Sequence, residues 1–177
     1  MEMIFERTKG IESVNTHYCP GCTHGIAHRL VAEVLQEMNE LENSIVVVPV
    51  GCAVLANEYF AFDSIQAAHG RAPATATGIK RVHKDKMVLT YQGDGDLASI
   101  GMAEIVHAAA RSENITTIFI NNGTYGMTGG QMAPTTLPGM KTTTTQNGRD
   151  VKIQGFPIKV SEMLATLDGA RYIERAS

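Results

Sequence analysis

Three apolar runs divide the chain into segments typical of a parallel sheet. Residues 45–50, 87–91 and 115–120 contain no charged side chain, as expected for strands that are buried on both faces. The second and third runs are separated by an alanine-rich segment, residues 98–111, that suits a helix. A connection of this length is too long for a hairpin, so the pattern predicts a right-handed parallel crossover.

Helical periodicity appears around these strands. Thr23 can cap a helix that runs to about residue 43. Its apolar face would consist of Ile26, Leu30, Val34, Met38 and Leu41. Further helices are expected over residues 53–60, 74–83 and 160–167, and another strand is expected to start within residues 169–175. The chain is therefore predicted to be an α/β protein with a mostly parallel sheet and helices on both faces.

Three segments lack this regularity. Residues 1–16 predict an irregular lead-in, and residues 63–73 are rich in turn formers. Residues 123–150 contain many Gly, Thr and Pro residues and show little periodicity. So long an irregular segment is unusual in a compact domain unless it is functional. Because it directly follows a predicted strand, we expect it to cover an active site, the alternative being a mobile surface insertion.

Composition narrows the class of protein. A length of 177 residues suits one domain with a sizeable core, so we expect residues 1–177 to form a single domain. A net charge of −3 argues against a nucleic-acid partner. No apolar run approaches the ~20 residues of a membrane span, and residues 1–7 lack the apolar part of a signal peptide. Three cysteines, an odd number, favour reduced thiols and a cytoplasmic location.

Two polar clusters follow the central strands. Gly93-Asp94-Gly95-Asp96 ends the second apolar run, and Asn121-Asn122 ends the third. Parallel sheets bind their ligands beyond these carboxyl ends. A glycine loop before a helix offers N–H groups to phosphate, but the Asp94 carboxylate would repel phosphate unless a cation lay between them. Asp94 and Asn122 supply oxygen ligands suited to Mg²⁺, so the pair predicts a clamp for magnesium and a diphosphate.

The same glycines allow other interpretations. Gly93, Gly95 and Ala98 also fit a dinucleotide-binding fingerprint. That fingerprint expects an acidic residue at the end of the next strand, where this chain has Asn121 and Asn122 instead. A third alternative is that the glycines serve only a tight turn between strand and helix. The magnesium interpretation is the one that accounts for both clusters.

The spacing of the two clusters is the signature of thiamine diphosphate enzymes, and four further motifs narrow the family. They are Tyr18-Cys19-Pro20-Gly21-Cys22-Thr23-His24-Gly25, Gly51-Cys52, His69-Gly70-Arg71-Ala72-Pro73-Ala74 and Tyr125-Gly126-Met127-Thr128-Gly129-Gly130-Gln131. Together, over residues 15–175, they resemble the thiamine-binding β subunit of 2-oxoacid:ferredoxin oxidoreductases. The resemblance is greatest to the branch that uses 2-oxoisovalerate and 2-oxoglutarate.

The resemblance implies roles for individual residues. Asp94 and Asn122 would bind Mg²⁺ through their side chains, and Thr124 would bind it through its carbonyl. His69 is a candidate catalytic residue, with a plain surface or core imidazole as the alternative. The other positions expected around thiamine diphosphate are Gly51, Cys52, Gly70, Gly93, Gly95, Asp96, Tyr125, Gly126, Met127 and Thr128.

One group needed for this chemistry is missing. Thiamine is activated by a glutamate near its aminopyrimidine ring, which these enzymes supply from a pyrimidine-binding domain. Glu58 and Glu104 fall within predicted helices, away from the strand ends. The resemblance therefore implies a separate α subunit that carries the glutamate, together with a ferredoxin or ferredoxin-like partner.

The cysteines have several interpretations. Cys19 and Cys22, with His24, could hold zinc or form a redox dithiol. In the family, Cys19, Cys22 and Cys52 correspond to three of the four ligands of a [4Fe–4S] cluster, and the fourth lies beyond the end of this sequence. We therefore expect that the sequence is truncated at its C-terminus and that, as it stands, it carries no stable cluster, although its three cysteine sulfurs should lie close together. Three buried structural cysteines are the remaining alternative.

The resemblance implies oxidative decarboxylation of a 2-oxoacid to acyl-coenzyme A and CO₂, with electrons passing to ferredoxin. Gly129 stands where many relatives have a lysine that can pair with a substrate carboxylate, which favours a branched-chain substrate, 2-oxoisovalerate, over 2-oxoglutarate. One rival is a subunit of a non-oxidative thiamine-dependent decarboxylase. Another is a metal-binding interaction module built on Cys19, Cys22 and His24.

Overall fold

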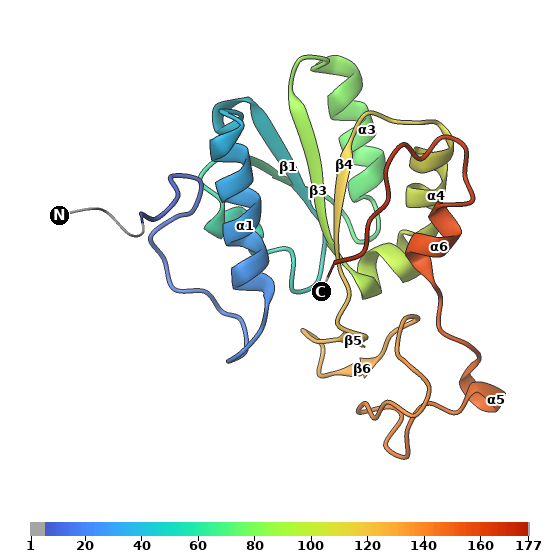
Figure 1. The fold of residues 1–177 in the computed structure, drawn as a ribbon. Helices are drawn as coiled ribbons and strands as arrows, with labels where there is room; N and C mark the ends of the chain where they lie inside the picture. Colours follow the sequence, from blue (N-terminus) through green and yellow to red (C-terminus); the bar gives the residue numbers. More distant parts are fainter. Residues whose placement is uncertain (1–5, 177) are drawn as a thin grey trace.

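The computed structural model describes residues 6–176, in which a four-stranded parallel sheet forms the centre (Figure 1). The strands lie in the order β2-β1-β3-β4. Their bounds are β1 Ser44–Val48, β2 Asp63–Gln66, β3 Met87–Gly93 and β4 Thr116–Ile120. The predicted parallel crossover is confirmed, because β3 pairs with β4 in parallel register from Leu89 opposite Thr116. The predicted fold class is confirmed with it.

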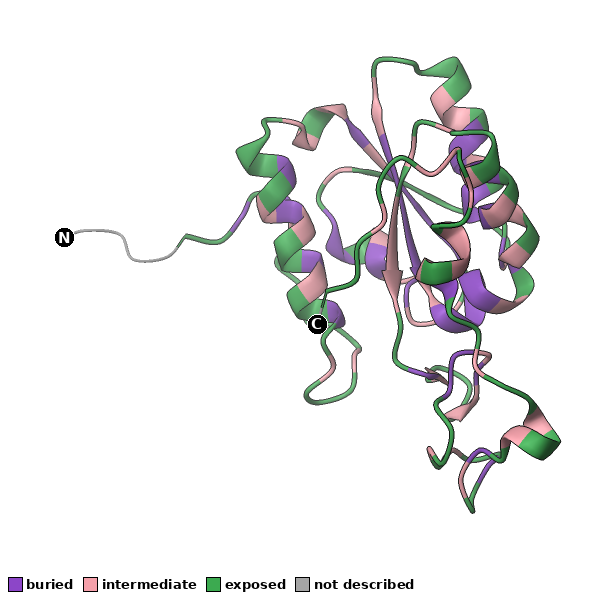
Figure 2. Ribbon diagram, turned by 45° about the vertical axis from the view of Figure 1, so that its right-hand side comes forward, coloured by how far each residue is buried: buried purple, intermediate pink, exposed green. Residues whose placement is uncertain are grey.

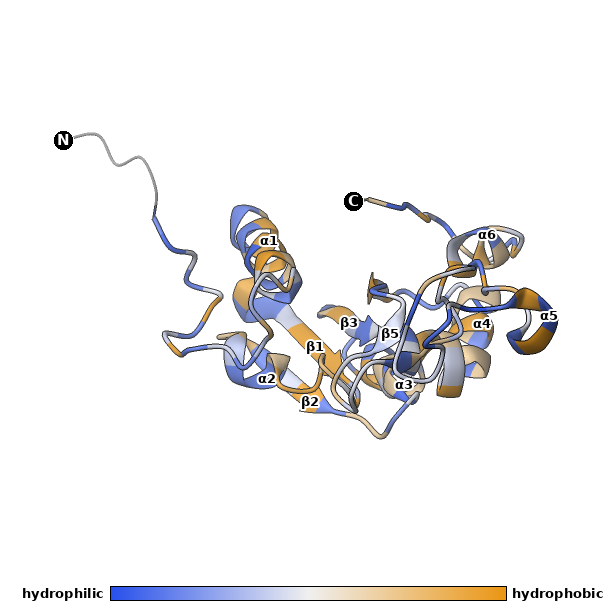
Figure 3. Cartoon of the chain, turned by 90° about the horizontal axis from the view of Figure 1, so that it is seen from below, coloured by the Kyte–Doolittle hydropathy of each residue, from blue (hydrophilic) through white to orange (hydrophobic). Residues whose placement is uncertain are grey.

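Helices cover both faces of this sheet. The longer ones are α1 His24–Glu37, α3 Ala72–Val82 and α4 Met102–Ala110, and the shorter ones are α2 Ala56–Tyr59, α5 Val151–Gln154 and α6 Val160–Leu164. Seen from below, α1 and α3 lie on opposite sides of the strands (Figure 3). The chain enters α4 through a π-helical turn, Asp96–Ile100, that directly follows the glycine motif.

The alternating direction of side chains along the strands explains why the sheet has a hydrophobic cluster on each of its two faces. Side chains on successive strand residues point to opposite faces. Val46 and Val48 therefore pack with Leu35 of α1, whereas Val47 packs with Ala72 and Ala76 of α3. The central strands are consequently buried along most of their length (Figure 2). Burial on both faces is the physical reason that the sequences of β1 and β3 contain no charged residue.

The prediction for the first helix was wrong in its length and in its buried face. α1 ends at Glu37, and a separate 3₁₀ turn follows at Leu41–Asn43. Asn39 lies between them with a positive φ of 58°, which interrupts the helix. The apolar positions at Ile26, Leu30, Val34 and Met38 are all more than half exposed. The buried residues of the helix are instead His24, His28, Ala32 and Leu35.

Two predictions about strands were also wrong. Residues 63–66, taken as part of a turn-rich segment, form the edge strand β2, and all four are exposed. Since no residue of β2 is buried, its sequence shows no apolar pattern. Residues 169–175 form no strand, although one was expected there. The helix predicted at 160–167 is confirmed in the shorter form of α6.

The segment after β4 is irregular for most of its length, as predicted. It contains a small hairpin of β5 Thr124–Tyr125 and β6 Gln131–Met132. Residues 6–16 are irregular as well, apart from a bridge between Ile11 and Phe60, and residues 1–5 of the expected lead-in lie outside the described part. Within residues 6–176, no helix is long and apolar enough to cross a membrane.

Candidate functional site

A cavity of about 140 Å³ opens at the carboxyl ends of β1, β3 and β4. It is lined by residues of five separate segments, which the parallel sheet brings to one edge. The lining residues are His24, Val50, Gly51, Cys52, His69, Gly93, Asp94, Gly95, Asp96, Ile120, Asn122, Thr124, Tyr125, Gly126, Met127 and Thr128. Every residue expected around the cofactor lies here except Gly70, which is buried behind the wall.

Asp94 lies at the end of β3 with only 2% of its surface exposed. Its Oδ1 accepts a hydrogen bond from the Gly95 N–H at 2.8 Å, and its Oδ2 accepts from the Gly123 N–H at 2.7 Å. Thr135 Oγ1 also donates to Oδ2, at 2.7 Å. Burial raises the pKa of the Asp94 carboxyl, and these three donors oppose that rise. A carboxylate has about four lone-pair positions, so one remains for a cation.

The turn after β4 holds the other predicted magnesium ligands. Asn122 Oδ1 accepts a hydrogen bond from the Thr124 N–H at 3.0 Å, which closes a local turn. Gly123 adopts a φ of +73° at the centre of this turn, a conformation that glycine tolerates best. Because the Gly123 N–H also bonds Asp94, the turn is fixed against the glycine motif. Asp94, Asn122 and Thr124 therefore face one cavity.

Gly95 and Gly126 leave room for the backbone to approach its neighbours. A Cβ at Gly95 would overlap the ring of Tyr125, so this turn packs against the ring without a gap. A Cβ at Gly126 would lie 3.3 Å from the Cys52 sulfur and 3.7 Å from the Asn122 amide nitrogen. Gly126 thus lies close to both Cys52 and Asn122.

Unlike Asp94, Asp96 binds a side chain or backbone group of the segment around His69 and of β3 with both of its carboxylate oxygens. Its Oδ1 accepts from the Gly70 N–H at 2.6 Å and from His69 Nδ1 at 2.5 Å, and its Oδ2 accepts from Gln92 Nε2 at 2.7 Å. The carboxylate is 2% exposed, and its contacts hold the His69-Gly70 turn against β3. With Nδ1 hydrogen-bonded, Nε2 is the nitrogen of His69 left for the cavity that this residue lines. This arrangement depends on residues 26 and 27 positions apart, which no sequence signal indicated.

The three cysteines differ in their position relative to the cavity. The Cys22 N–H donates to the Cys19 carbonyl at 2.9 Å, so these residues form a tight turn, and only Cys52 lines the cavity. Burial raises the pKa of the Cys52 thiol, the Met127 N–H lowers it, and the charges of Cys22 and Cys19 raise it again. All three thiols are free. Among residues 6–176, no three His, Cys, Asp or Glu side chains are grouped so that they could hold a metal ion.

A group of rings packs around His24, which lines the cavity. His24 Nδ1 and Tyr91 Oη are joined by a hydrogen bond of 2.7 Å, and Tyr18 stacks on His24 at 4.7 Å between ring centroids. Burial, reinforced by the charges of His24 and His17, lowers the pKa of His28 to about 3. Burial is also the main cause that lowers the pKa of His24 and raises that of Tyr91. Sequence reasoning considered His24 only as a zinc ligand and missed its place in the cavity wall.

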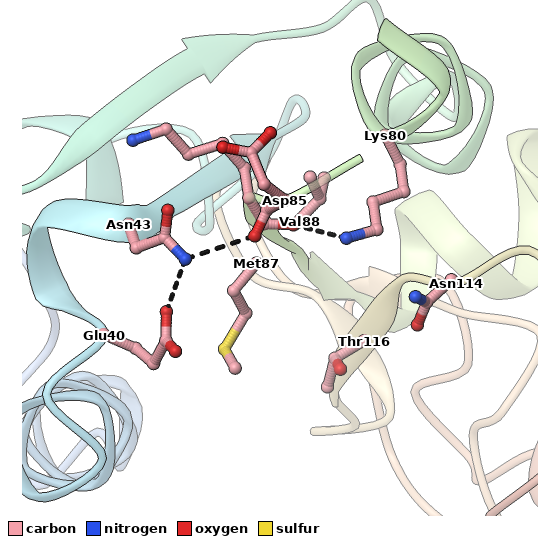
Figure 4. Close-up of a pocket in the computed structure, with 9 residues that line it drawn as sticks. Glu40, Asn43, Lys80, Asp85, Met87, Val88, Asn114 and Thr116 are labelled. Carbon is pink, nitrogen blue, oxygen red and sulfur yellow. Dashed lines mark hydrogen bonds between the residues drawn. The ribbon is translucent and has the colours of Figure 1, made fainter. Parts of the chain in front are cut away.

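A second cavity, of about 220 Å³, lies at the opposite, amino ends of the strands (Figure 4). Lys80 Nζ, on its wall, donates to the carbonyls of Lys84 and Lys86 at 2.9 and 2.5 Å. Asn43 Nδ2 donates to Glu40 Oε2 at 2.7 Å and to the Asp85 carbonyl at 3.2 Å. None of the predicted cofactor-binding residues lines this cavity.

Comparison with known proteins defines the class. The family of thiamine pyrophosphate enzymes, in its C-terminal TPP binding domain, matches residues 49–176. This range includes both clusters at the strand ends. The chain belongs to this family of thiamine pyrophosphate-binding domains.

Individual relatives show to which enzymes of this family the chain is similar. The chain is 51% identical over 174 residues to the ketoisovalerate oxidoreductase subunit VorA of Methanothermobacter thermautotrophicus, covering 98% of this chain and 36% of that protein. It is 37% identical over 164 residues to the 2-oxoglutarate synthase subunit KorB of Archaeoglobus fulgidus, covering 93% of this chain and 60% of that protein. The chain thus spans about a third of the length of the first relative.

A solved structure agrees with these relatives. The 2-oxoglutarate:ferredoxin oxidoreductase from Magnetococcus marinus, with 2-oxoglutarate, coenzyme A and succinyl-CoA bound, superposes with a TM-score of 0.80 at 31% identity. The match covers 88% of this chain and 53% of that one. The resemblance to the 2-oxoacid:ferredoxin oxidoreductases, inferred from the motifs, is confirmed.

The residues of the cavity fit a diphosphate with Mg²⁺, whereas the three cysteines do not fit an iron–sulfur cluster. The glycine turn, the spare lone pair of Asp94 and the Asn122 turn fit a diphosphate with Mg²⁺, because oxygen donors and backbone N–H groups converge there. The three cysteines do not fit an iron–sulfur cluster as they lie, since they form no group of metal ligands in the described residues.

Proposed function

We propose that this chain is the thiamine diphosphate-binding β subunit of a 2-oxoacid:ferredoxin oxidoreductase. The observation that carries the proposal is that Asp94 and Asn122, from two strand ends, line one cavity in a chain that belongs to the thiamine pyrophosphate family. The reaction is oxidative decarboxylation of a 2-oxoacid, with coenzyme A accepting the acyl group and ferredoxin the electrons. The names of the relatives, VorA and KorB, support this assignment.

Asp94, Asn122 and the Thr124 carbonyl would hold Mg²⁺ against the diphosphate, which the N–H groups of the glycine turn would also bind. When bound, thiamine supplies the electron sink that makes loss of CO₂ from a 2-oxoacid feasible. The work of this chain is to orient the cofactor. Tyr125 and Gly126 would seat the cofactor beside Cys52, because both line the cavity and Gly126 lies close to Cys52 and Asn122.

His69 is the candidate for proton transfer. Its Nδ1 donates to Asp96, which is itself fixed by Gln92 and Gly70, so the ring has one orientation and one tautomer. Its Nε2 is then a hydrogen-bond acceptor at the cavity wall. A histidine oriented by a carboxylate is a common arrangement for general acid–base catalysis.

The activating glutamate comes, in this proposal, from an α subunit that carries the pyrimidine-binding domain. The cavity lining supports a glutamate from another chain. Of the described residues that line the cavity, only Asp94 and Asp96 carry a carboxylate. Glu104 is paired with Arg71 at 2.5 Å on α4, and Glu58 is exposed on α2. The active site would then be shared between two chains.

The substrate is proposed to be a branched-chain 2-oxoacid, with 2-oxoisovalerate preferred to 2-oxoglutarate. The 51% identity to a ketoisovalerate oxidoreductase subunit supports this order. Gly129 adopts a φ of +117°, where a lysine would be strained, so the segment in its present conformation favours no basic side chain there.

The test uses the protein purified with its partner subunits. We expect reduction of ferredoxin that requires thiamine diphosphate, coenzyme A and a 2-oxoacid, with a higher kcat/KM for 2-oxoisovalerate than for 2-oxoglutarate. We also expect deuterium exchange at the thiazolium carbon to be rapid only when the α subunit is present. CO₂ release without coenzyme A or an electron acceptor would favour a non-oxidative decarboxylase instead. Rapid exchange in the lone chain would contradict the shared site.

A further inference from the structure

The loop segment, residues 123–158, reaches the Asp94 carboxylate through one side chain. Thr135 Oγ1 donates to Asp94 Oδ2 at 2.7 Å, across 41 positions of sequence. The same oxygen accepts the Gly123 N–H at 2.7 Å. Thr135 is 5% exposed, so no water competes freely for this bond. The loop segment therefore contributes directly to the orientation of the proposed magnesium ligand.

The next residue fixes Gly123 from its other side. Thr136 Oγ1 donates to the Gly123 carbonyl at 2.5 Å and accepts the Ala133 N–H at 2.8 Å. Thr136 is fully buried. Gly123 is thus held at its N–H by Asp94 and at its carbonyl by Thr136. Because Gly123 lies between Asn122 and Thr124, these bonds also determine where the other proposed ligands lie.

Arg149 holds the backbone on both sides of Thr135. Its Nη1 donates to the Pro134 carbonyl at 3.0 Å and to the Thr136 carbonyl at 2.6 Å. Its Nε and Nη2 donate to the carbonyls of Gly155 and Gln154, at 3.0 and 3.3 Å. The residue is 6% exposed. Every hydrogen-bond acceptor found for its guanidinium in the described residues is a backbone carbonyl.

Burying a guanidinium costs free energy unless its N–H donors are hydrogen-bonded. Here those donors bind backbone carbonyls of the loop segment, so the hydrogen bonds fix the conformation of that segment. The planar group presents its N–H donors in a fixed arrangement, so the carbonyls that it binds are fixed relative to one another. The backbone at Pro134 and Thr136 therefore has one conformation. That conformation directs the Thr135 hydroxyl at Asp94.

We propose that Thr135 and Arg149 are positioning residues for the magnesium–diphosphate site, with Arg149 acting through Thr135. This inference rests on the proposed function. Neither residue lines the cavity, so neither is a catalytic residue. Partners that orient a metal ligand typically contribute 10- to 100-fold to metal affinity. The hydroxyl of Thr135 and the guanidinium of Arg149 are the groups that must supply this effect.

The experiment measures Mg²⁺ affinity by calorimetric titration at saturating thiamine diphosphate, in the full chain purified with its partner subunits. Thr135→Val removes the hydroxyl with little change of shape, and we expect Mg²⁺ to bind about 10-fold more weakly. Thr135→Ser keeps the hydroxyl and should restore most of the affinity. A purely structural role for the methyl group would give the opposite order, with Val tolerated and Ser not.

Arg149→Lys tests the second step, since it keeps the charge but loses the planar donors. We expect a loss of about 10-fold in the wild-type background and a much smaller loss in the Thr135→Val background, because both changes break the same connection. Equal losses in both backgrounds would refute the action of Arg149 through Thr135. The control is Thr143→Val, which alters an exposed threonine of the same segment and should leave the affinity unchanged.

The outcomes separate the two proposals. If the wild-type protein binds no thiamine diphosphate with Mg²⁺, the proposed function fails and this inference fails with it. If the wild-type protein binds both and Thr135→Val binds Mg²⁺ equally well, only the inference fails. Should Arg149→Lys fail to fold, as shown by a lost thermal transition, the comparison of Thr135→Val with Thr135→Ser still decides the role of the hydroxyl.

Discussion

The two ends of the sheet carry two cavities that differ in how their polar groups are used. At the amino ends, one cavity has a lysine and an asparagine whose donors are taken up by nearby carbonyls and a carboxylate. At the carboxyl ends, the other cavity is lined by the buried carboxylate of Asp94, which retains a lone pair. The amino-end cavity also has a carboxylate, Asp85, but that residue is exposed.

The difference follows from the direction of the strands. In a parallel sheet, every strand points its carboxyl end to the same edge, and the loops that leave there begin the next helices. The glycine motif at Gly93–Asp96 and the turn at Asn122 meet at this edge because β3 and β4 are neighbours. At the other edge, the loops return from helices, and their polar groups, such as Lys80, terminate those helices and turns. Two pairs of substitutions and one single substitution test this contrast.

The largest difference in cofactor affinity is expected between substitutions of Asp94 and Asp85, one carboxylate from each cavity. Asp94→Ala removes the charged ligand of the proposed clamp, so thiamine diphosphate affinity in the presence of Mg²⁺ should fall by about 100-fold or more. Asp85→Ala, at the other cavity, should leave this affinity unchanged. Cofactor titration with and without Mg²⁺ measures both. Equal affinity for the two variants would remove the basis for assigning the site to the carboxyl ends.

Substitution of a glycine in the carboxyl-end cavity, compared with one in α3, is expected to have a smaller effect on cofactor affinity. Gly95→Ala places a methyl group against the Tyr125 ring in the cavity wall, which must shift. We expect cofactor affinity to drop by about 10-fold, the lower end of the effect of disturbing the supports of a metal site. Gly78→Ala, in α3 with open space around its Cβ, should raise the free energy of unfolding by about 0.5–1 kcal/mol and leave binding unchanged. If Gly95→Ala binds the cofactor normally, the close approach of turn and ring is not needed.

The smallest effect is expected from a substitution of Lys80, which should change stability and leave cofactor affinity unaltered. Lys80→Met keeps the length of the side chain and removes its two hydrogen bonds to carbonyls, so the free energy of unfolding should fall by about 1 kcal/mol. Cofactor affinity should not change. Urea denaturation and cofactor titration of one preparation provide the two measurements. A weaker cofactor affinity in this variant would mean that the amino-end cavity contributes to binding after all.

Much of the fold and of the candidate site could be predicted because the relevant signals are local. The runs at 45–50, 87–91 and 115–120 predicted β1, β3 and β4, and the first two of these are buried along most of their length, as expected for central strands of a parallel sheet. The clusters at Asp94 and Asn122 directly follow two of them, so the strand ends alone predicted that these side chains share one edge. The edge strand β2 was missed because all four of its residues are exposed, whereas the other edge strand, β4, is exposed only at its first residue.

Other features required contacts between residues far apart in the chain. The sequence by itself determined the central strands, the glycine turn and the two polar clusters, because each depends on a few adjacent residues. Only the tertiary structure decided that α1 buries its histidines rather than its aliphatic face. It alone brought Asp96 to His69 and Thr135 to Asp94. A buried polar group needs a hydrogen-bond partner, but which of many candidates provides it depends on how the whole chain packs.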